Sequence, residues 1–120
     1  MAAQTYSHET GLGHALDILG KRWALLIVGD LLTGPKRFTD LRNRLARIPS
    51  NILSARLKEL ELTGIARRTP APQPVGGVVY ELTELGAELE DVVLRLDKWG
   101  ARLPVGQGSS GSDLPRMSSR

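Results

Sequence analysis

The stretch "PSNILSARLKELELTG", residues 49–64, decides the fold of this chain. Three leucines recur at intervals of four and three residues, the spacing of one helix face: Leu53, Leu57 and Leu60. Ser50 is a favourable N-cap, and Gly64 stands where helices commonly end. The stretch therefore predicts a short helix with an apolar inner face.

The outer face of this helix needs a second explanation, because folding requires only the inner one. It carries small or hydrogen-bonding side chains: Asn51, Ser54, Ala55 and Lys58. Asn can bond adenine, Ser can bond several base edges, Ala can touch a thymine methyl, and Lys58 suits a phosphate or a guanine. Arg56, at the flank, suits a backbone phosphate, and the amides of Ser50 and Asn51 can also meet one. The face predicts DNA recognition. The alternative is that Asn51 and Ser54 only stabilise the start of the helix.

Three helices are predicted before this stretch. Apolar residues recur at helical spacing over 12–19 and stop at Gly20. "RWALLIVGDLLTG", residues 22–34, is apolar nearly all round, which is typical of a buried helix, and Gly34-Pro35 ends it. "KRFTDLRNRLARIP", residues 36–49, predicts a short third helix that Thr39 can cap, followed by a turn.

Two strands and a last helix are predicted after it. "IARRT", residues 65–69, and "VVYELT", residues 78–83, alternate enough to pair across the Pro- and Gly-rich segment 70–77. Thr83 then caps a final helix. That helix carries one apolar stripe: Leu85, Leu89, Val92, Val93, Leu96, Trp99 and Leu103.

The order of elements predicts a mainly α fold with a small β-hairpin, which is a winged helix-turn-helix with flanking dimerisation helices. We expect residues 1–10 to form a flexible arm and residues 11–103 to form the winged domain. Residues 104–120 are polar and rich in Gly and Ser, and we expect a disordered tail there.

Charge is segregated along the chain, although the net charge is only +3. Residues 21–68 carry eleven Lys and Arg against four acids, whereas residues 81–101 carry six acids against two bases. A basic middle predicts a surface for a polyanion, with a simple solvated face as the alternative.

Basic and polar side chains outside the recognition helix complete the predicted DNA surface. The preceding turn and helix supply Lys36, Arg37, Arg42 and Arg44, and the wing supplies Arg67, Arg68 and Gln73. Such phosphate contacts make binding fall steeply with salt. Arg67 and Arg68 are adjacent on a strand and point to opposite faces, so we expect one to contact phosphate and the other to brace the domain.

Several motifs together resemble the HxlR family of bacterial winged helix-turn-helix regulators, a group related to MarR-like regulators. They are "GKRW", "GPKRF", "RLKEL" and "YELTELG", in order within residues 12–100. The resemblance implies a homodimer that binds operator DNA through the fourth helix and the wing, as a transcriptional regulator.

Two features depart from that family pattern. Many members carry a Cys-Pro near the first helix, used by some as a thiol sensor, but this chain has "HETGLG" there and no Cys anywhere. Many relatives also carry a Lys or Arg just before the second wing strand, where this chain has Gly76-Gly77. Thiol sensing is excluded, and minor-groove anchoring by the wing tip is not expected to follow the family pattern.

The apolar stripe of the last helix is more than one small domain can cover, so it predicts a two-fold dimer. The first helix is expected to join this interface through Leu12, Leu16 and Leu19. The alternatives are packing on its own domain and a protein-interaction module that uses the acidic C-terminal helix. A dimer would present its recognition helices about 34 Å apart, to a partly palindromic site.

Other functions find little support in the sequence. There is no nucleophile–base pair, phosphate loop or carboxylate dyad, so we expect no enzyme, no catalytic residue and no cofactor, and two His without Cys give no metal site. No apolar run approaches the roughly 20 residues that span a bilayer, and a cytoplasmic location is expected. A small-molecule effector stays open, with four candidate lining residues: Tyr6, His14, Trp23 and Trp99. Trp23 is more consistent with the core and His14 with the surface.

Overall fold

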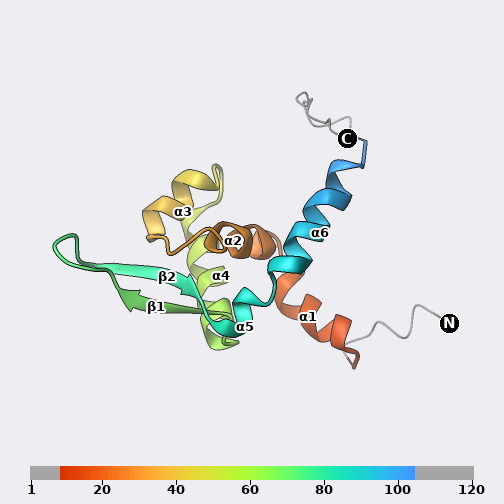
Figure 1. Ribbon diagram of the computed structural model, residues 1–120, viewed down its shortest axis with the longest axis horizontal. Coiled ribbons are helices and arrows are strands. Elements are labelled where there is room, and N and C mark those ends of the chain that lie inside the picture. Colours follow the sequence, from red (N-terminus) through yellow and green to blue (C-terminus); the bar gives the residue numbers. More distant parts are fainter. Residues whose placement is uncertain (1–8, 105–120) are drawn as a thin grey trace. The chain divides into compact units, whose positions relative to one another are not determined.

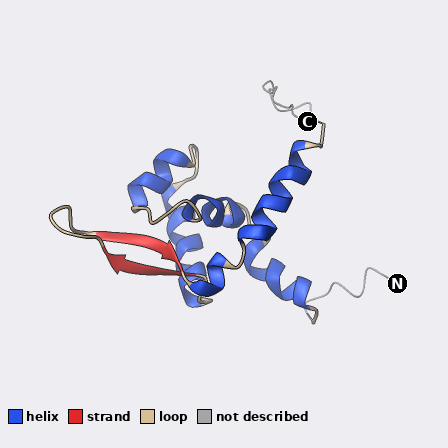
Figure 2. Ribbon diagram, in the orientation of Figure 1, coloured by secondary structure: helices blue, strands red, loops and turns tan. Residues whose placement is uncertain are grey.

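The computed structural model describes residues 9–104. The helices are α1 (Gly11–Leu19), α2 (Ala24–Leu31), α3 (Phe38–Arg44), α4 (Ser50–Leu62), α5 (Glu84–Ala87) and α6 (Glu90–Ala101), and the strands are β1 (Ala66–Pro70) and β2 (Val78–Leu82). Figures 1 and 2 show the hairpin of β1 and β2 projecting from helices α2–α4. The mainly helical winged helix-turn-helix is confirmed.

The described residues form two compact units, one ending at Leu89 and the other beginning at Glu90. The arm predicted for residues 1–10 lies mostly outside the described residues, as does the tail beyond residue 104. Of that arm, Thr10 is described, and its Oγ1 accepts a bond of 2.9 Å from the Gly13 amide at the start of α1. The division into arm, domain and tail stays a prediction.

The core of the first unit is built from α2, α3 and α4. Its largest fully buried side chains are Ile27, Val28, Leu41, Leu53, Leu57 and Leu60. Burial of each such side chain stabilises the fold by about 1.5–3 kcal/mol relative to exposure. The inward direction of the three α4 leucines is therefore confirmed.

Helix α2 is less buried than its composition suggested. Ala24, Ile27, Val28 and Leu31 are buried, but Leu26 is 59% exposed. Trp23, expected in the core, is half-buried and precedes the helix with a φ of 81°. A helix this short packs only one side against α3 and α4, so the opposite side stays outside the core even where it is apolar.

Two predicted caps are wrong. Ser50 is the first residue of α4, and Pro49 is its N-cap, because the Pro49 carbonyl already accepts from the Ile52 and Leu53 amides at 3.0 Å. Thr39 lies inside α3, whose N-cap is Arg37; there the Asp40 carboxylate accepts from the Arg37 amide at 2.9 Å. Each helix begins earlier than its hydroxyl residue suggested.

The predicted final helix is interrupted. Thr83 caps the short α5, with its hydroxyl accepting from the Gly86 amide at 3.1 Å, and α6 begins only at Glu90. Gly86 lies against the Ile65 carbonyl, and a Cβ at Gly86 would overlap it. This close approach holds α5 against the start of the wing.

The hairpin pairs antiparallel from Ala66 opposite Leu82 to Pro70 opposite Val78. A bridge between Lys36 and Tyr80 links β2 to the α2–α3 connection. The wing is thus joined to the helices along its second strand. Within residues 9–104 no helix is long and apolar enough to cross a bilayer.

Candidate nucleic-acid interface

The outer face of α4 is the centre of the candidate interface. Asn51, Ser54, Ala55 and Lys58 are all exposed, while Leu53, Leu57 and Leu60 of the same helix are buried. Gly64, with a φ of 82°, follows the last turn. The core therefore fixes the rotation of α4 about its axis, and this rotation presents the polar side chains outward.

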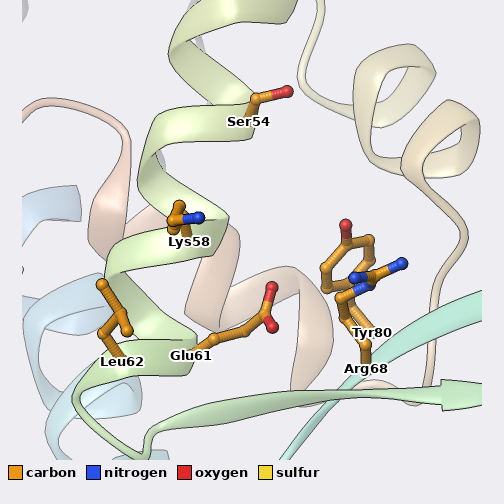
Figure 3. Close-up of a pocket in the computed structure, with 6 residues that line it drawn as sticks. All are labelled: Ser54, Lys58, Glu61, Leu62, Arg68 and Tyr80. Carbon is orange, nitrogen blue, oxygen red and sulfur yellow. The ribbon is translucent and has the colours of Figure 1, made fainter.

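A groove of about 260 Å³ separates the outer face of α4 from the wing. Its lining residues are Ser54, Lys58, Glu61, Leu62, Arg68 and Tyr80. Figure 3 shows Ser54 and Lys58 projecting from α4, and Arg68 beside Tyr80 on the strands. Helix and wing thus place hydrogen-bonding and cationic groups around one open space.

Arg67 and Arg68 point to opposite faces of β1, as strand geometry requires. The Arg67 Nε donates to the Glu81 carboxylate at 2.8 Å, and these residues are direct cross-strand partners. Arg68 is the partner of Tyr80 and lines the groove beside α4. Arg67 therefore has an acidic partner, and Arg68 shares the face of Ser54 and Lys58.

The cations of the α2–α3 connection are held within the fold. The Lys36 ammonium donates to the Thr33 hydroxyl at 2.8 Å and to the Gly34 carbonyl at 2.9 Å, at the end of α2. The Arg37 guanidinium donates to the carbonyl of Gly76 in the wing. Lys36 therefore satisfies carbonyls where the helix dipole favours a cation, and Arg37 reaches across to the wing.

The other residues predicted to contact DNA differ in their surroundings. Arg42 is exposed on α3, and Gln73 is exposed in the wing loop. The Arg44 Nε bonds both oxygens of Asp30, at 2.7 and 2.9 Å. The Arg56 Nε donates to the Arg22 carbonyl at 2.9 Å, so Arg56 braces α4 against the segment before α2.

A second basic pocket, of about 390 Å³, lies on the flank of α4 away from the wing. Its lining residues are Arg22, Trp23, Arg47, Pro49, Ile52 and Arg56. The Arg22 guanidinium lies 5.3 Å from the centroid of the Trp23 ring. Arg22 and Arg47 were not among the predicted contacts, although "GKRW" and "ARIP" mark both positions; the sequence separation of 25 residues between Arg22 and Arg47 hid their proximity.

The residues predicted for the dimer leave much apolar surface uncovered. Of the first unit, Leu12, Leu16 and Leu85 are 49–54% exposed. Leu19, Leu85 and Leu89 also line an apolar groove of about 270 Å³ with Ile65. Such a surface is unusual unless a partner or ligand covers it.

Helix α6, taken by itself, also exposes apolar side chains. None of its residues is buried in the described chain. Four stripe residues in and after it are about half exposed: Val92, Leu96, Trp99 and Leu103. Val93 is half-buried.

A metal site does not appear in the part of the chain that the structure describes. There, no group of three His, Asp or Glu residues could hold a metal ion. His14 is exposed on α1, as its position suggested. Tyr6 lies outside the described residues.

Comparison with known proteins gives one consistent result. A family model described as HxlR-like helix-turn-helix matches residues 18–105. The HTH-type transcriptional regulator YvaP of Bacillus subtilis (strain 168) is 41% identical over 85 residues, which cover 71% of this chain and 79% of YvaP. YodB of the same organism, also an HTH-type transcriptional regulator, is 40% identical over 85 residues, covering 71% and 76%.

Solved structures agree with these sequence matches. The redox regulator HypR in its oxidized form superposes with a TM-score of 0.73 at 32% identity, covering 81% of this chain and 100% of HypR. Quinone-bound YodB from B. subtilis superposes with a TM-score of 0.64 at 37% identity, covering 75% and 94%. YvaP and YodB are thus HTH-type transcriptional regulators, and HypR is a redox regulator.

Proposed function

The chain belongs to the HxlR-like helix-turn-helix family of DNA-binding transcriptional regulators, and from this premise we propose that it is a homodimeric repressor that occupies operator DNA. The observation that carries the proposal is the outer face of α4. Its polar side chains are exposed while the leucines that fix its rotation are fully buried.

The proposed contacts divide into base-reading and phosphate-binding residues. Asn51, Ser54 and Ala55 enter the major groove from the N-terminal half of α4, and Lys58 meets a phosphate or a guanine. Phosphate contacts on the wing side come from Arg68 and Gln73. Ser50, Arg37 and Arg42 stay within the proposed surface.

Three of the predicted cations, which have intrachain partners, have a smaller proposed part in DNA binding. Lys36 donates to groups at the end of α2. Arg56 donates to the Arg22 carbonyl, and Arg67 donates to the Glu81 carboxylate. The pocket on the other flank of α4 adds Arg22 and Arg47 to the proposed surface. A helix inserted in the major groove lies between the two DNA backbones. This pocket would then face the backbone opposite to the one on the wing side.

The proposed dimer uses the exposed apolar residues of α1, α5 and α6. Its support is the half-exposed state of Leu12, Leu16, Leu85, Val92, Leu96, Trp99 and Leu103, to which Leu19, Leu89 and Val93 are adjacent. Repression follows if the dimer covers a promoter. The DNA partner makes the cytoplasm the proposed location.

A small-molecule effector is part of the proposal. The structure of quinone-bound YodB supports a quinone-type compound. This chain contains no Cys, so such a compound must bind here without a thiol. The apolar groove lined by Leu19, Ile65 and Leu85 is the proposed place.

A mobility-shift assay with DNA upstream of the protein's own gene tests DNA binding, and selection from random DNA gives the site and its symmetry. We expect a salt-sensitive shift and a two-fold site. Asn51→Ala with Lys58→Ala should abolish the specific shift, whereas Arg95→Ala on α6 should not. A protein-interaction role through α6 predicts no specific shift with the wild type, and that role should survive the replacement of Asn51 and Lys58.

A further inference from the structure

The wing loop contains no positive charge of its own. Residues 69–80 include no Lys or Arg. Within the loop, the Ala71 amide donates to the Gly77 carbonyl at 2.8 Å and the Gly76 amide donates to the Pro72 carbonyl at 3.1 Å. A two-stranded hairpin is at best marginally stable alone, so contacts from outside the hairpin must set the direction of this loop.

Arg37 is well placed to supply such a contact because its backbone is fixed on both sides. Before it, Lys36 and Tyr80 exchange two backbone bonds, of 2.9 and 2.7 Å, which attach β2 to the α2–α3 connection. At Arg37 itself, the amide donates to the Asp40 carboxylate at 2.9 Å. The side chain therefore starts from a point tied to both the wing and α3.

The guanidinium of Arg37 lies against the two glycines of the loop. Its Nη2 donates to the Gly76 carbonyl. A Cβ at Gly77 would lie 2.7 Å from Nη1, whereas a Cβ at Gly76 would meet only the Gln73 amide, at 3.8 Å. Both glycines have positive φ, 69° and 81°. The missing side chain at Gly77 is what makes room for the guanidinium.

We propose that Arg37 is the positioning residue of the wing: it ties the loop 71–77 to the helix-turn-helix and brings to that loop the positive charge that the loop lacks. This inference rests on the proposed function, in which the wing contacts the DNA backbone. Many relatives carry a cation where this chain has Gly76-Gly77. The inference assigns Gly77 the role of making room for the Arg37 guanidinium. One Nη2 bond goes to Gly76, and the remaining donors of the guanidinium are available to a phosphate.

The first test needs no DNA. Amide hydrogen exchange of the full-length free protein should show faster exchange at Ala71 and Gly76 in Arg37→Met, while Thr83, whose amide bonds Ile65 at the base of the hairpin, stays unchanged. Arg37→Lys should behave like Arg37→Met, because it keeps the charge but loses the planar fork. Unchanged exchange at Ala71 and Gly76 in both variants would overturn the positioning role.

The second test uses two matched glycine variants and the selected operator DNA. Gly77→Ala and Gly76→Ala bear the same cost of positive φ, but only Gly77→Ala displaces the Arg37 guanidinium. We expect Arg37→Met to raise the dissociation constant about tenfold. Gly77→Ala should come close to that value, and Gly76→Ala should have a clearly smaller effect.

The double variant Arg37→Met with Gly77→Ala separates the alternatives. If the two residues act together, it should bind no more weakly than Arg37→Met alone. Additive losses, or equal effects of the two glycine variants, would contradict the inference. A wild-type protein that binds no DNA would refute the proposed function, while the exchange measurement would still decide whether Arg37 positions the wing.

Discussion

Replacing Arg68 by Gln should weaken DNA binding, whereas the same replacement of Arg67 should not. The two residues are neighbours on β1 with the same charge and the same strand geometry, so they form a matched pair. Arg68 lines the groove beside Ser54. Arg67 bonds Glu81 at 2.8 Å, with 54% of its side chain and 28% of the Glu81 side chain exposed.

The magnitude follows from counterion release. Each phosphate contact contributes about 0.9 to the slope of log affinity against log salt. A dimer carries Arg68 twice, so Arg68→Gln should reduce the slope by about 1.8. As the salt rises from about 50 to about 200 mM, the ratio of the wild-type affinity to the variant affinity should then fall about twelvefold.

Arg67→Gln breaks an exposed ion pair and should lower the free energy of unfolding by about 0.2–1 kcal/mol. The slope should stay at the wild-type value. Fluorescence anisotropy of labelled operator DNA, titrated at four salt concentrations, measures both slopes, and urea denaturation measures the stability. Equal slope losses in the two variants, or a loss only in Arg67→Gln, would refute the assignment of Arg68 to the DNA face.

Three further predictions concern stability and assembly. Leu53→Ala should cost about 2–5 kcal/mol in urea denaturation because it opens a cavity at a fully buried position; a loss below about 1 kcal/mol would mean that α4 is not anchored there. Leu96→Glu should convert dimers to monomers in sedimentation velocity, with Arg95→Gln on the same helix as the control that stays dimeric. Thr83→Val removes the hydroxyl that accepts from the Gly86 amide at 3.1 Å, and should lower the stability by about 1 kcal/mol. An unchanged melting temperature would exclude that capping role.

Local patterns in the sequence were enough to locate most elements. The leucine spacing in α4 identified its inner face because one helical period decides which side chains share a face. The strands β1 and β2 lie within a residue or two of "IARRT" and "VVYELT", since alternation and the Pro- and Gly-rich loop are local signals. The opposite directions of Arg67 and Arg68 also followed from strand geometry alone.

Helix starts were less predictable. A Ser or Thr near a helix start is one of several candidates for the N-cap. Which residue becomes the N-cap depends on which backbone carbonyl accepts the first intrahelical hydrogen bond. At α4 that carbonyl belongs to Pro49. At α3 the cap involves Asp40 rather than Thr39.

The sequence by itself determined the winged helix-turn-helix and the outward face of α4, because periodicity and turn chemistry act over a few neighbouring residues. Only the tertiary structure decided which intrachain partner each cation finds. Lys36 turns to the end of α2, Arg67 to Glu81, and Arg37 to Gly76, 39 residues further along the chain. Such pairings depend on which segments the buried core brings together. A local sequence pattern cannot predict contacts between residues that are far apart in the sequence.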